Sequence, residues 1–298
     1  MRELKIKNIF IYGNCQVKSL VPCFQILLAG SFQVSGIWDF HPESKKLLNN
    51  AIKGSPDLII TNLDIEIVKN AGWDGQILKI PSIYFGGFHP DTIYFRKDNG
   101  QTPMFFKNNA SISAIALWSV KNGLSVQEAL QLYQEEVFHD LGYFDYFDVC
   151  LEALAFDFER HKISMNAVYK FICSRSIFMW GPLHPKIKIM MTLASEVCAS
   201  LSLKVTQNAE ALGELMPDPL QQEYAWGVYP PIADRLGVPG TWSVRHHSQI
   251  FLTTESYLNA IYNEFNDNSL QDIDFSPEDK FRFSKLTHID RVLSRPLK

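Results

Sequence analysis

The first 80 residues alternate between short apolar runs and segments in which apolar residues recur at helical spacing. Strands are predicted at 8–12, 33–37, 58–61 and 76–80, and helices at about 16–28 and within 41–53. In the first helix Leu20, Phe24 and Leu27 fall on one face, as in a helix that packs on one side only. Apolar strands that alternate with such helices are typical of a parallel sheet covered on both faces.

From position 111 onward the helical pattern dominates. Helices are predicted at 111–121, from Ser125, and at about 144–161, 186–200 and 256–266. Ser125 and Glu128 have the spacing of a capping box. We therefore predict an α/β protein with a mostly parallel sheet and flanking helices in the N-terminal part, and a predominantly helical C-terminal part. The expected division is an α/β core at 1–108 and a mainly helical part at 109–298, packed together as one continuous structural unit.

Composition excludes several classes of protein. The 298 residues are 46% hydrophobic and 20% charged, which suffices for a packed core and argues against long disordered stretches. A net charge of −4 gives no basic field for nucleic acid. No run of about 18 apolar residues predicts a membrane span. The charged N-terminus and five cysteines without CxxC pairs lead us to expect a cytoplasmic protein with reduced thiols and no metal site.

The most informative segment is Ile9–Gln16, where an apolar strand turns into a helix at Cys15. A thiol at a helix N-terminus meets backbone N–H groups and the positive end of the helix dipole, which favour the thiolate. Gly13 and Asn14 tolerate the positive φ values that a sharp turn often needs. The pattern suggests a nucleophile in an anion-stabilising pocket, although a small buried thiol under a turn fits it equally well.

A cysteine nucleophile needs an oxyanion stabiliser and a base. The backbone N–H groups of Gln16 and Val17, the Gln16 side chain and the Asn62 amide are the candidate donors. Residues 12–15, 61–63 and 81–82 all follow predicted strands, so they should meet at the carboxyl edge of the sheet. Asn62 alone would otherwise be interpreted as a turn or cap residue.

Two histidines precede proline, His89 and His184, each near glycine and aromatic residues. Proline biases the preceding residue away from helix, so both histidines are expected in loops that could face a cleft. Either one is a candidate base, and a solvent-facing loop is the plainer alternative. Asp91 could orient a histidine, as carboxylates do in hydrolase triads, or cap the turn.

These motifs together resemble one family, the capsule-biosynthesis acetyltransferases of the WcbI type. The matching segments are Tyr12-Gly13-Asn14-Cys15-Gln16, Thr61-Asn62-Leu63, Phe88-His89-Pro90-Asp91, Ser113–Trp118 with Gly123, His184-Pro185, and Tyr229-Pro230-Pro231 with Leu236-Gly237. The resemblance implies a bacterial cytoplasmic enzyme that binds coenzyme A and O-acetylates a polysaccharide or its sugar precursor. It points to Cys15, Gln16, His89 and His184 as site residues.

On this basis we expect acetyl transfer from acetyl-coenzyme A to a sugar hydroxyl. Cys15 would attack or bind the thioester, Gln16 and Asn62 would stabilise the oxyanion, and His89 or His184 would act as base. The coenzyme would be held by Asn14, Gln16, Lys186 and Arg245. Arg96, Lys97, Lys107 and Arg175 are further basic candidates for its phosphates, and each could equally be a surface charge.

Two other functions fit the same residues. One is a cysteine-dependent esterase or thioesterase, for which SGNH-type hydrolases offer a distant analogy of architecture. Those enzymes carry an Asp-x-x-His pair, and here Lys285 stands at that spacing before His288. The other is a non-catalytic component of a polysaccharide assembly complex, with other assembly proteins as its partners.

Overall fold

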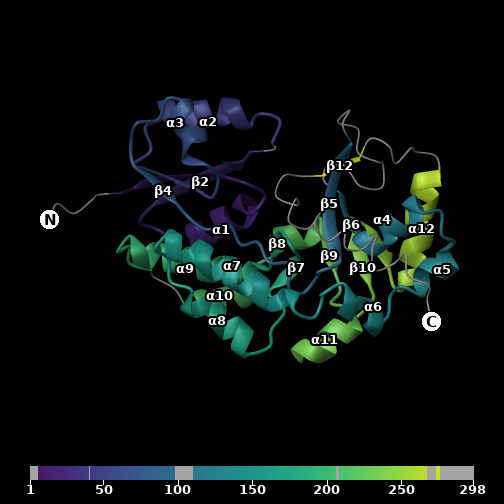
Figure 1. Cartoon of the computed structure of the whole chain (residues 1–298). Coiled ribbons are helices and arrows are strands. Elements are labelled where there is room, and N and C mark those ends of the chain that lie inside the picture. The colour runs from purple at the N-terminus through teal and green to yellow at the C-terminus, as the bar shows by residue number, and fades with distance from the viewer. Residues whose placement is uncertain (1–5, 40, 98–109, 206–207, 267–272, 276–298) are drawn as a thin grey trace. The chain divides into compact units, whose positions relative to one another are not determined.

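The computed structural model describes residues 6–39, 41–97, 110–205, 208–266 and 273–275 (Figure 1). Its contacts divide the chain into two compact units, each built from two stretches of sequence. Unit 1 comprises Met1–Phe85 and Leu151–Glu223, and unit 2 comprises Gly86–Cys150 and Tyr224–Lys298. The expected division at 108 stays a prediction.

Unit 1 contains a four-stranded parallel sheet in the order β2-β1-β3-β4. Its strands are β1 (Asn8–Gly13), β2 (Gln33–Trp38), β3 (Leu58–Thr61) and β4 (Ile77–Lys79). All four match predicted strands to within about two residues, and the parallel sheet is confirmed. Since β1 lies between β2 and β3, its carboxyl end has a strand end on either side. Open α/β sheets bind ligands at the edge formed by the carboxyl ends of their strands.

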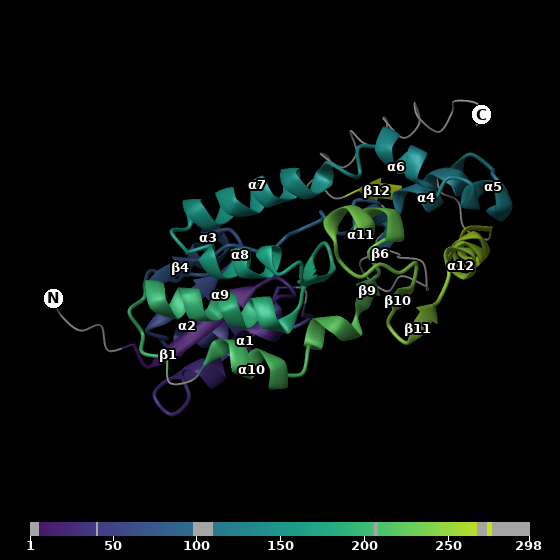
Figure 2. The same ribbon diagram turned by 90° about the horizontal axis from the view of Figure 1, so that it is seen from below.

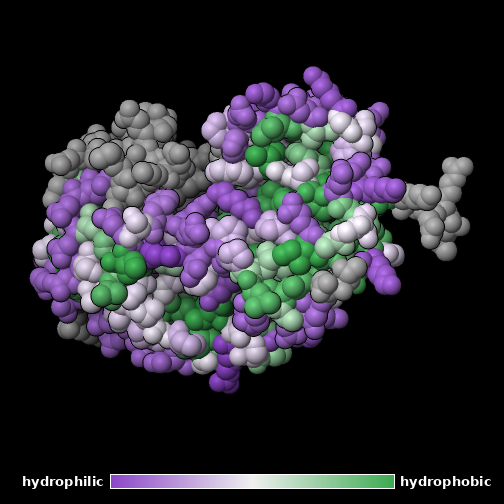
Figure 3. Space-filling model, turned by 180° about the vertical axis from the view of Figure 1, so that it is seen from behind, coloured by the Kyte–Doolittle hydropathy of each residue, from purple (hydrophilic) through white to green (hydrophobic). Residues whose placement is uncertain are grey.

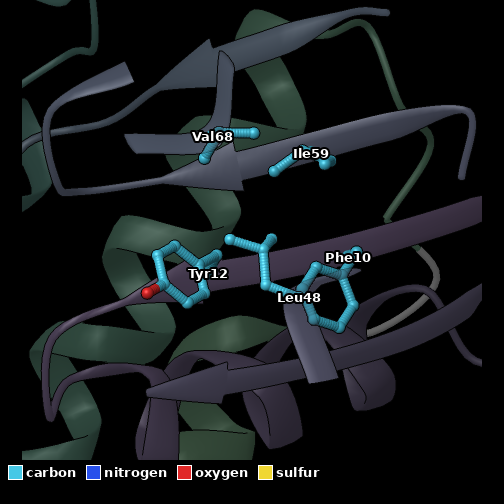
Figure 4. Packing of buried hydrophobic residues seen from close by; sticks show 5 residues of the cluster. All are labelled: Phe10, Tyr12, Leu48, Ile59 and Val68. Atoms are coloured by element: carbon cyan, nitrogen blue, oxygen red, sulfur yellow. The ribbon is translucent and has the colours of Figure 1, made fainter. Parts of the chain in front are cut away.

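The two central strands β1 and β3 are buried on both faces, which explains why they are apolar without alternation. On one face Phe10 and Tyr12 of β1 pack with Ile59, Leu48 and Val68 (Figure 4). The helices on that face are α2 (Ser44–Lys53) and α3 (Ile65–Asn70). The opposite face is covered by α1 (Val17–Leu27) and α9 (Ile187–Ser200), as Figures 1 and 2 show.

The second stretch of unit 1 adds helices and a small hairpin. These elements are α8 (Asn166–Cys173), β7 (Met179–Gly181), β8 (His184–Pro185), α10 (Ala209–Leu215) and the 3₁₀ helix η2 (Pro219–Gln222). The long helix α7 (Tyr146–Arg160) precedes them. β7 and β8 pair antiparallel, so the Pro182–Leu183 turn presents His184 at the start of a strand.

Unit 2 combines helices with two small antiparallel sheets, β12-β5-β6 and β11-β10-β9. The strands are β5 (Thr92–Lys97), β6 (Ala110–Ser113), β9 (Tyr224–Trp226), β10 (Val244–His246), β11 (Gln249–Phe251) and β12 (Ile273–Phe275). The helices are α4 (Ala114–Lys121), α5 (Val126–Leu130), α6 (Glu135–Asp140), α11 (Pro230–Leu236) and α12 (Thr254–Asn266).

The helical character of the C-terminal part is confirmed, and so is the capping box of Ser125 with Glu128. The predicted helix at 111–121 starts too early, because residues 111–113 belong to strand β6. The Ser113 hydroxyl accepts the N–H of Ala116, so Ser113 caps a helix that begins only at Ala114. The small strands of unit 2 are three to six residues long, too short for a clear alternation in the sequence.

Hydrophobic and hydrophilic side chains are interspersed on the face of the molecule in Figure 3. The large hydrophobic residues exposed among the described ones are Ile67, Val149, Phe156, Tyr169, Leu215, Ile250 and Leu252. Such scattered side chains are normal for a folded protein surface. Within the described ranges, no helix has both the length and the apolar character needed to cross a bilayer.

Candidate active site

The turn after β1 is closed by a side chain of the neighbouring strand end. A Cβ atom on Gly13 would lie 2.3 Å from Oδ1 of Asn62 and 2.9 Å from Cγ2 of Val17, so only glycine fits there. Neither Gly13 nor Asn14 has positive φ. The expectation of a left-handed turn was wrong, and the glycine serves close approach instead.

Two asparagines join the strand ends through reciprocal hydrogen bonds. The Asn14 backbone N–H donates to Oδ1 of Asn62 at 3.0 Å, and Nδ2 of Asn62 donates to Oδ1 of Asn14 at 2.9 Å. Nδ2 of Asn14 also donates to Oγ of Ser82 at 2.9 Å. The three segments predicted to meet at the sheet edge therefore do meet.

The Gln16 side chain is fully buried and clamps two other segments to the turn. Its Nε2 donates to the Ile83 carbonyl at 2.7 Å, and its Oε1 accepts the Ile83 N–H at 3.1 Å. Nε2 also lies 3.5 Å from the carbonyl of Leu183, the residue before His184. Gln16 follows Cys15 directly, so this clamp attaches the His184 hairpin to the cysteine turn.

Three of the predicted oxyanion donors already have acceptors within the protein. The Gln16 amide hydrogens are committed to carbonyls, the Gln16 N–H donates to Oδ1 of Asn14, and the Val17 N–H donates to the Asn14 carbonyl. An asparagine amide carries two hydrogens. Asn14 and Asn62 each donate one of them, and no acceptor in the described part of the chain takes the other. Each of these two amides therefore keeps one hydrogen that an oxyanion can accept.

Cys15 is partly exposed and has three charged neighbours from different segments. Burial, together with the carboxylates of Glu223 and Asp39, raises the pKa of its thiol to about 12, against the opposing effect of Lys18. The expected lowering of this pKa by the helix N-terminus is therefore wrong. At pH 7 a pKa of about 12 leaves roughly one thiolate in 10⁵ molecules, so the resting residue is a thiol.

His184 is 3% exposed and faces Glu223, one of the charged neighbours of Cys15. Its Nε2 lies 3.4 Å from Oε2 of Glu223, and the other carboxylate oxygen of Glu223 binds Nζ of Lys18. Burial lowers the pKa of His184 to about 3, and the charge of Lys18 contributes to the lowering. The imidazole is therefore neutral at pH 7.

Lys18 and Asp39 are held beside the turn by β2 and α1. Trp38 pairs with Gly13 across the sheet, and the Asp39 N–H donates to the Gly13 carbonyl at 2.8 Å. Nζ of Lys18 lies 3.8 Å from the centre of the Trp38 ring, a cation–π contact. The lysine is thus fixed over the tryptophan while it pairs with Glu223.

His89 belongs to unit 2 and is 4% exposed. Its Nε2 lies 3.0 Å from the Trp226 carbonyl oxygen. Its ring packs edge to face against the Phe88 ring, with 6.2 Å between the two ring centres. His89 thus meets a backbone carbonyl and an aromatic ring, whereas His184 faces the carboxylate of Glu223.

Asp91 caps a helix instead of orienting a histidine. Its Oδ1 accepts the Ile115 N–H at 3.1 Å and the Tyr143 hydroxyl at 2.8 Å, while Oδ2 accepts the Tyr229 hydroxyl at 3.0 Å. Burial raises the pKa of this carboxyl to about 6, against the lowering effect of these hydrogen bonds and one with Ser113. The carboxylate therefore serves the start of α4, whereas the predicted role as a cap was for its own turn.

The basic residues expected to hold a coenzyme belong to different units. Nζ of Lys186 lies 4.3 Å from the centre of the Trp180 ring in unit 1, whereas Arg245 lies in β10 of unit 2. Arg175 is exposed after α8. The side chains of Arg96 and Lys97, and all of Lys107 and His288, lie outside the described residues. No group of three or more His, Cys, Asp or Glu side chains within the described ranges could hold a metal ion.

Of the predicted site residues, the structure brings Cys15, Asn14, Asn62 and His184 together, and it adds Lys18, Asp39 and Glu223, which the sequence did not predict. Asp39 directly follows a predicted strand, so the strand-end rule could have found it. Lys18 lies one helical turn after Cys15. Glu223 lies in no motif, and only the folded chain brings it to the site.

The arrangement pairs a neutral thiol with a neutral imidazole, a carboxylate, an ammonium group and two amide donors. Such a set can remove a proton from a thiol or hydroxyl and stabilise charge on an oxygen that becomes tetrahedral. It is suited to acyl transfer.

Comparison with known proteins adds the family. A family model described as "Polysaccharide biosynthesis enzyme WcbI" matches residues 8–206. Searches among curated proteins and among solved structures found no match. The matched segment covers most of unit 1 and includes Cys15, Asn62 and His184, together with His89 of unit 2. The chain belongs to the WcbI family of polysaccharide biosynthesis enzymes.

Proposed function

We propose that this protein transfers an acetyl group from acetyl-coenzyme A to a hydroxyl of a capsular or exopolysaccharide sugar or its precursor. The observation that carries the proposal is the attachment of the His184 hairpin to the Cys15 turn through Gln16. The clamp supports the proposal because it links the segment of a candidate proton acceptor to that of a candidate thiol nucleophile, in a chain of a polysaccharide biosynthesis family. A thioester and a sugar hydroxyl are the reactants that such a site suits.

The resting thiol must lose its proton as it attacks. His184 accepts that proton while Sγ of Cys15 bonds to the thioester carbonyl carbon. The bond from that carbon to the coenzyme sulfur then breaks, and His184 returns the proton to the departing sulfur. One thioester replaces another, so this step is close to balance. A neutral imidazole is the form that can accept the proton.

The second half of the reaction uses the same residues. His184 accepts the proton of the sugar hydroxyl as its oxygen bonds to the acetyl carbon. The bond to Sγ breaks, and Cys15 recovers its thiol with that proton. In both halves the remaining amide hydrogens of Asn14 and Asn62 are the donors for the carbonyl oxygen.

Three measurements test this function. Intact mass after mixing with acetyl-coenzyme A should show one added acetyl group in the wild type and none in Cys15→Ala. Calorimetry should show coenzyme A binding, which a non-catalytic assembly component would lack. Release of coenzyme A should accelerate when a sugar acceptor is added. If wild type and Cys15→Ala turn over equally, the covalent mechanism is wrong. If the rate is independent of acceptor and acetate accumulates, the protein is a hydrolase.

A further inference from the structure

Glu223 stands apart from every sequence motif and lies beyond the matched family segment 8–206. It follows η2 and is one-third exposed, at 31% of its side chain. Its two carboxylate oxygens nevertheless have different partners. Oε1 binds Nζ of Lys18 in the first turn of α1, and Oε2 faces Nε2 of His184 at 3.4 Å.

This bridge bears on which histidine nitrogen carries the proton. A carboxylate accepts hydrogen bonds and cannot donate one, so the ring nitrogen that faces it carries the hydrogen. The backbone of Leu220 also accepts a hydrogen bond from this ring and favours its protonated form. With the hydrogen on Nε2, the lone pair of the neutral ring is on Nδ1.

The bridge also bears on charge. The ammonium group of Lys18 disfavours a positive charge on His184. Whenever His184 takes a proton, an imidazolium forms close to this ammonium. The carboxylate of Glu223 lies against both, so it offsets the repulsion at the step where the charge develops.

We propose that Glu223 is the positioning residue of His184: it holds the ring as the Nε2–H tautomer, so that Nδ1 accepts the proton, and it balances Lys18 when the imidazolium forms. This inference rests on the proposed function for its kinetic consequence. Its statement about the tautomer concerns the resting protein and stands independently of any substrate.

The chain offers matched variants that separate this role from the ion pair. Glu223→Gln removes the charge with little change of shape. Lys18→Met removes the same ion pair but leaves the carboxylate against His184. Glu214→Gln breaks a comparable pair, that of Glu214 with Lys188, at an exposed place on α10 and α9. A melting curve for each variant establishes that it is folded, and Glu223→Asp provides a variant that keeps the carboxylate.

The experiment records the tautomer of His184 by long-range ¹H–¹⁵N spectra of histidine-labelled protein, with the signals assigned by their loss in His184→Asn. The wild type, Lys18→Met and Glu214→Gln should show the Nε2–H tautomer. Glu223→Gln should show a mixture, because the backbone of Leu220 then remains as acceptor without the carboxylate, and an amide can either donate to the ring or accept from it. With acetyl-coenzyme A and an acceptor, kcat of Glu223→Gln should fall about 10²-fold while KM changes little. Glu223→Asp should recover part of kcat.

The proposal is overturned if Glu223→Gln keeps the wild-type tautomer and kcat, or if its spectrum changes while kcat does not. It is also overturned if Lys18→Met shows the same mixture of tautomers, since the carboxylate would then serve only to hold the lysine. If the wild type transfers no acetyl group, the proposed function fails. The spectra still decide the tautomer in that case, so the two failures are distinguishable.

Discussion

The two His-Pro pairs look alike in the sequence, but the structure surrounds the two histidines with different groups. In unit 1, His184 faces the Glu223 carboxylate, with Lys18 on the other oxygen and Cys15 within the same set of charges. In unit 2, His89 meets a backbone carbonyl and a phenylalanine ring. Both histidines are buried. Burial beside glycine and proline is thus common to both histidines, and the charged groups from distant segments around His184 are the reason we propose that residue as the base.

The same contrast holds for the acids. Glu223 of unit 1 has a lysine and a histidine as partners and remains one-third exposed. Asp91 of unit 2 is fully enclosed by hydroxyl and N–H donors. The first arrangement leaves charge available to a reaction. The second uses the carboxylate to fix the start of a helix.

The largest difference should be in catalysis. His184→Asn should lower acetyl transfer by about 10³-fold, because the thiol at the site cannot ionise by itself. His89→Asn should reduce the rate per folded molecule less than about fivefold, since its partner is structural. Turnover of both variants, corrected for folded fraction, checks this. Equal losses would contradict the division of roles.

The next effect is on stability. Asp91→Ala should lower the free energy of unfolding by about 3 kcal/mol or more, because it leaves two tyrosine hydroxyls and an N–H without their acceptor. Asp64→Ala, which removes an exposed cap at the start of α3, should cost about 1 kcal/mol. Urea unfolding of both variants measures the difference. If both variants lose a similar amount of unfolding free energy, the enclosure of Asp91 contributes nothing beyond an ordinary exposed cap.

The pH dependence of stability sharpens the same point. The pKa of Asp91 is raised to about 6 in the folded protein, above its unfolded value. Its protonation therefore stabilises the fold fully below about pH 4, and this stabilisation is lost as the pH rises through 6. The stability of wild type relative to Asp91→Asn should be about 1 kcal/mol greater at pH 5 than at pH 7. Urea unfolding of both proteins at the two pH values measures this, and an equal difference in unfolding free energy at pH 5 and pH 7 would refute it.

The smallest effect concerns the thiol. With the exposed Cys173 replaced by serine, Cys15 should react slowly with iodoacetamide at pH 7.5, and its rate should keep rising beyond pH 9. Glu223→Gln or Asp39→Asn should accelerate alkylation about fivefold by removing a charge that raises its pKa, and Lys18→Met should slow it. A fast reaction that is already maximal at pH 7 would show a preformed thiolate.

The parallel sheet and the meeting of its strand ends could be predicted, because both depend on periodicity and on the polar residues that follow each strand. The role of Gln16 could not, since its amide is used by Ile83 and Leu183, which are far away in sequence. The pKa of Cys15 was predicted with the wrong sign, because the helix N-terminus was visible in the sequence and the burial and two carboxylates were not. The start of α4 was misplaced, because Ser113 ends a strand and caps a helix at once.

The central claim is that Cys15 and His184 act together in acyl transfer. The most direct measurement is peptide mass mapping after brief mixing with excess acetyl-coenzyme A and acid quench, in the absence of acceptor. Acetyl should be found on the peptide that contains Cys15 in the wild type and in His89→Asn, and it should be lost in His184→Asn. Full labelling of Cys15 in His184→Asn, or its loss in His89→Asn alone, would contradict the account.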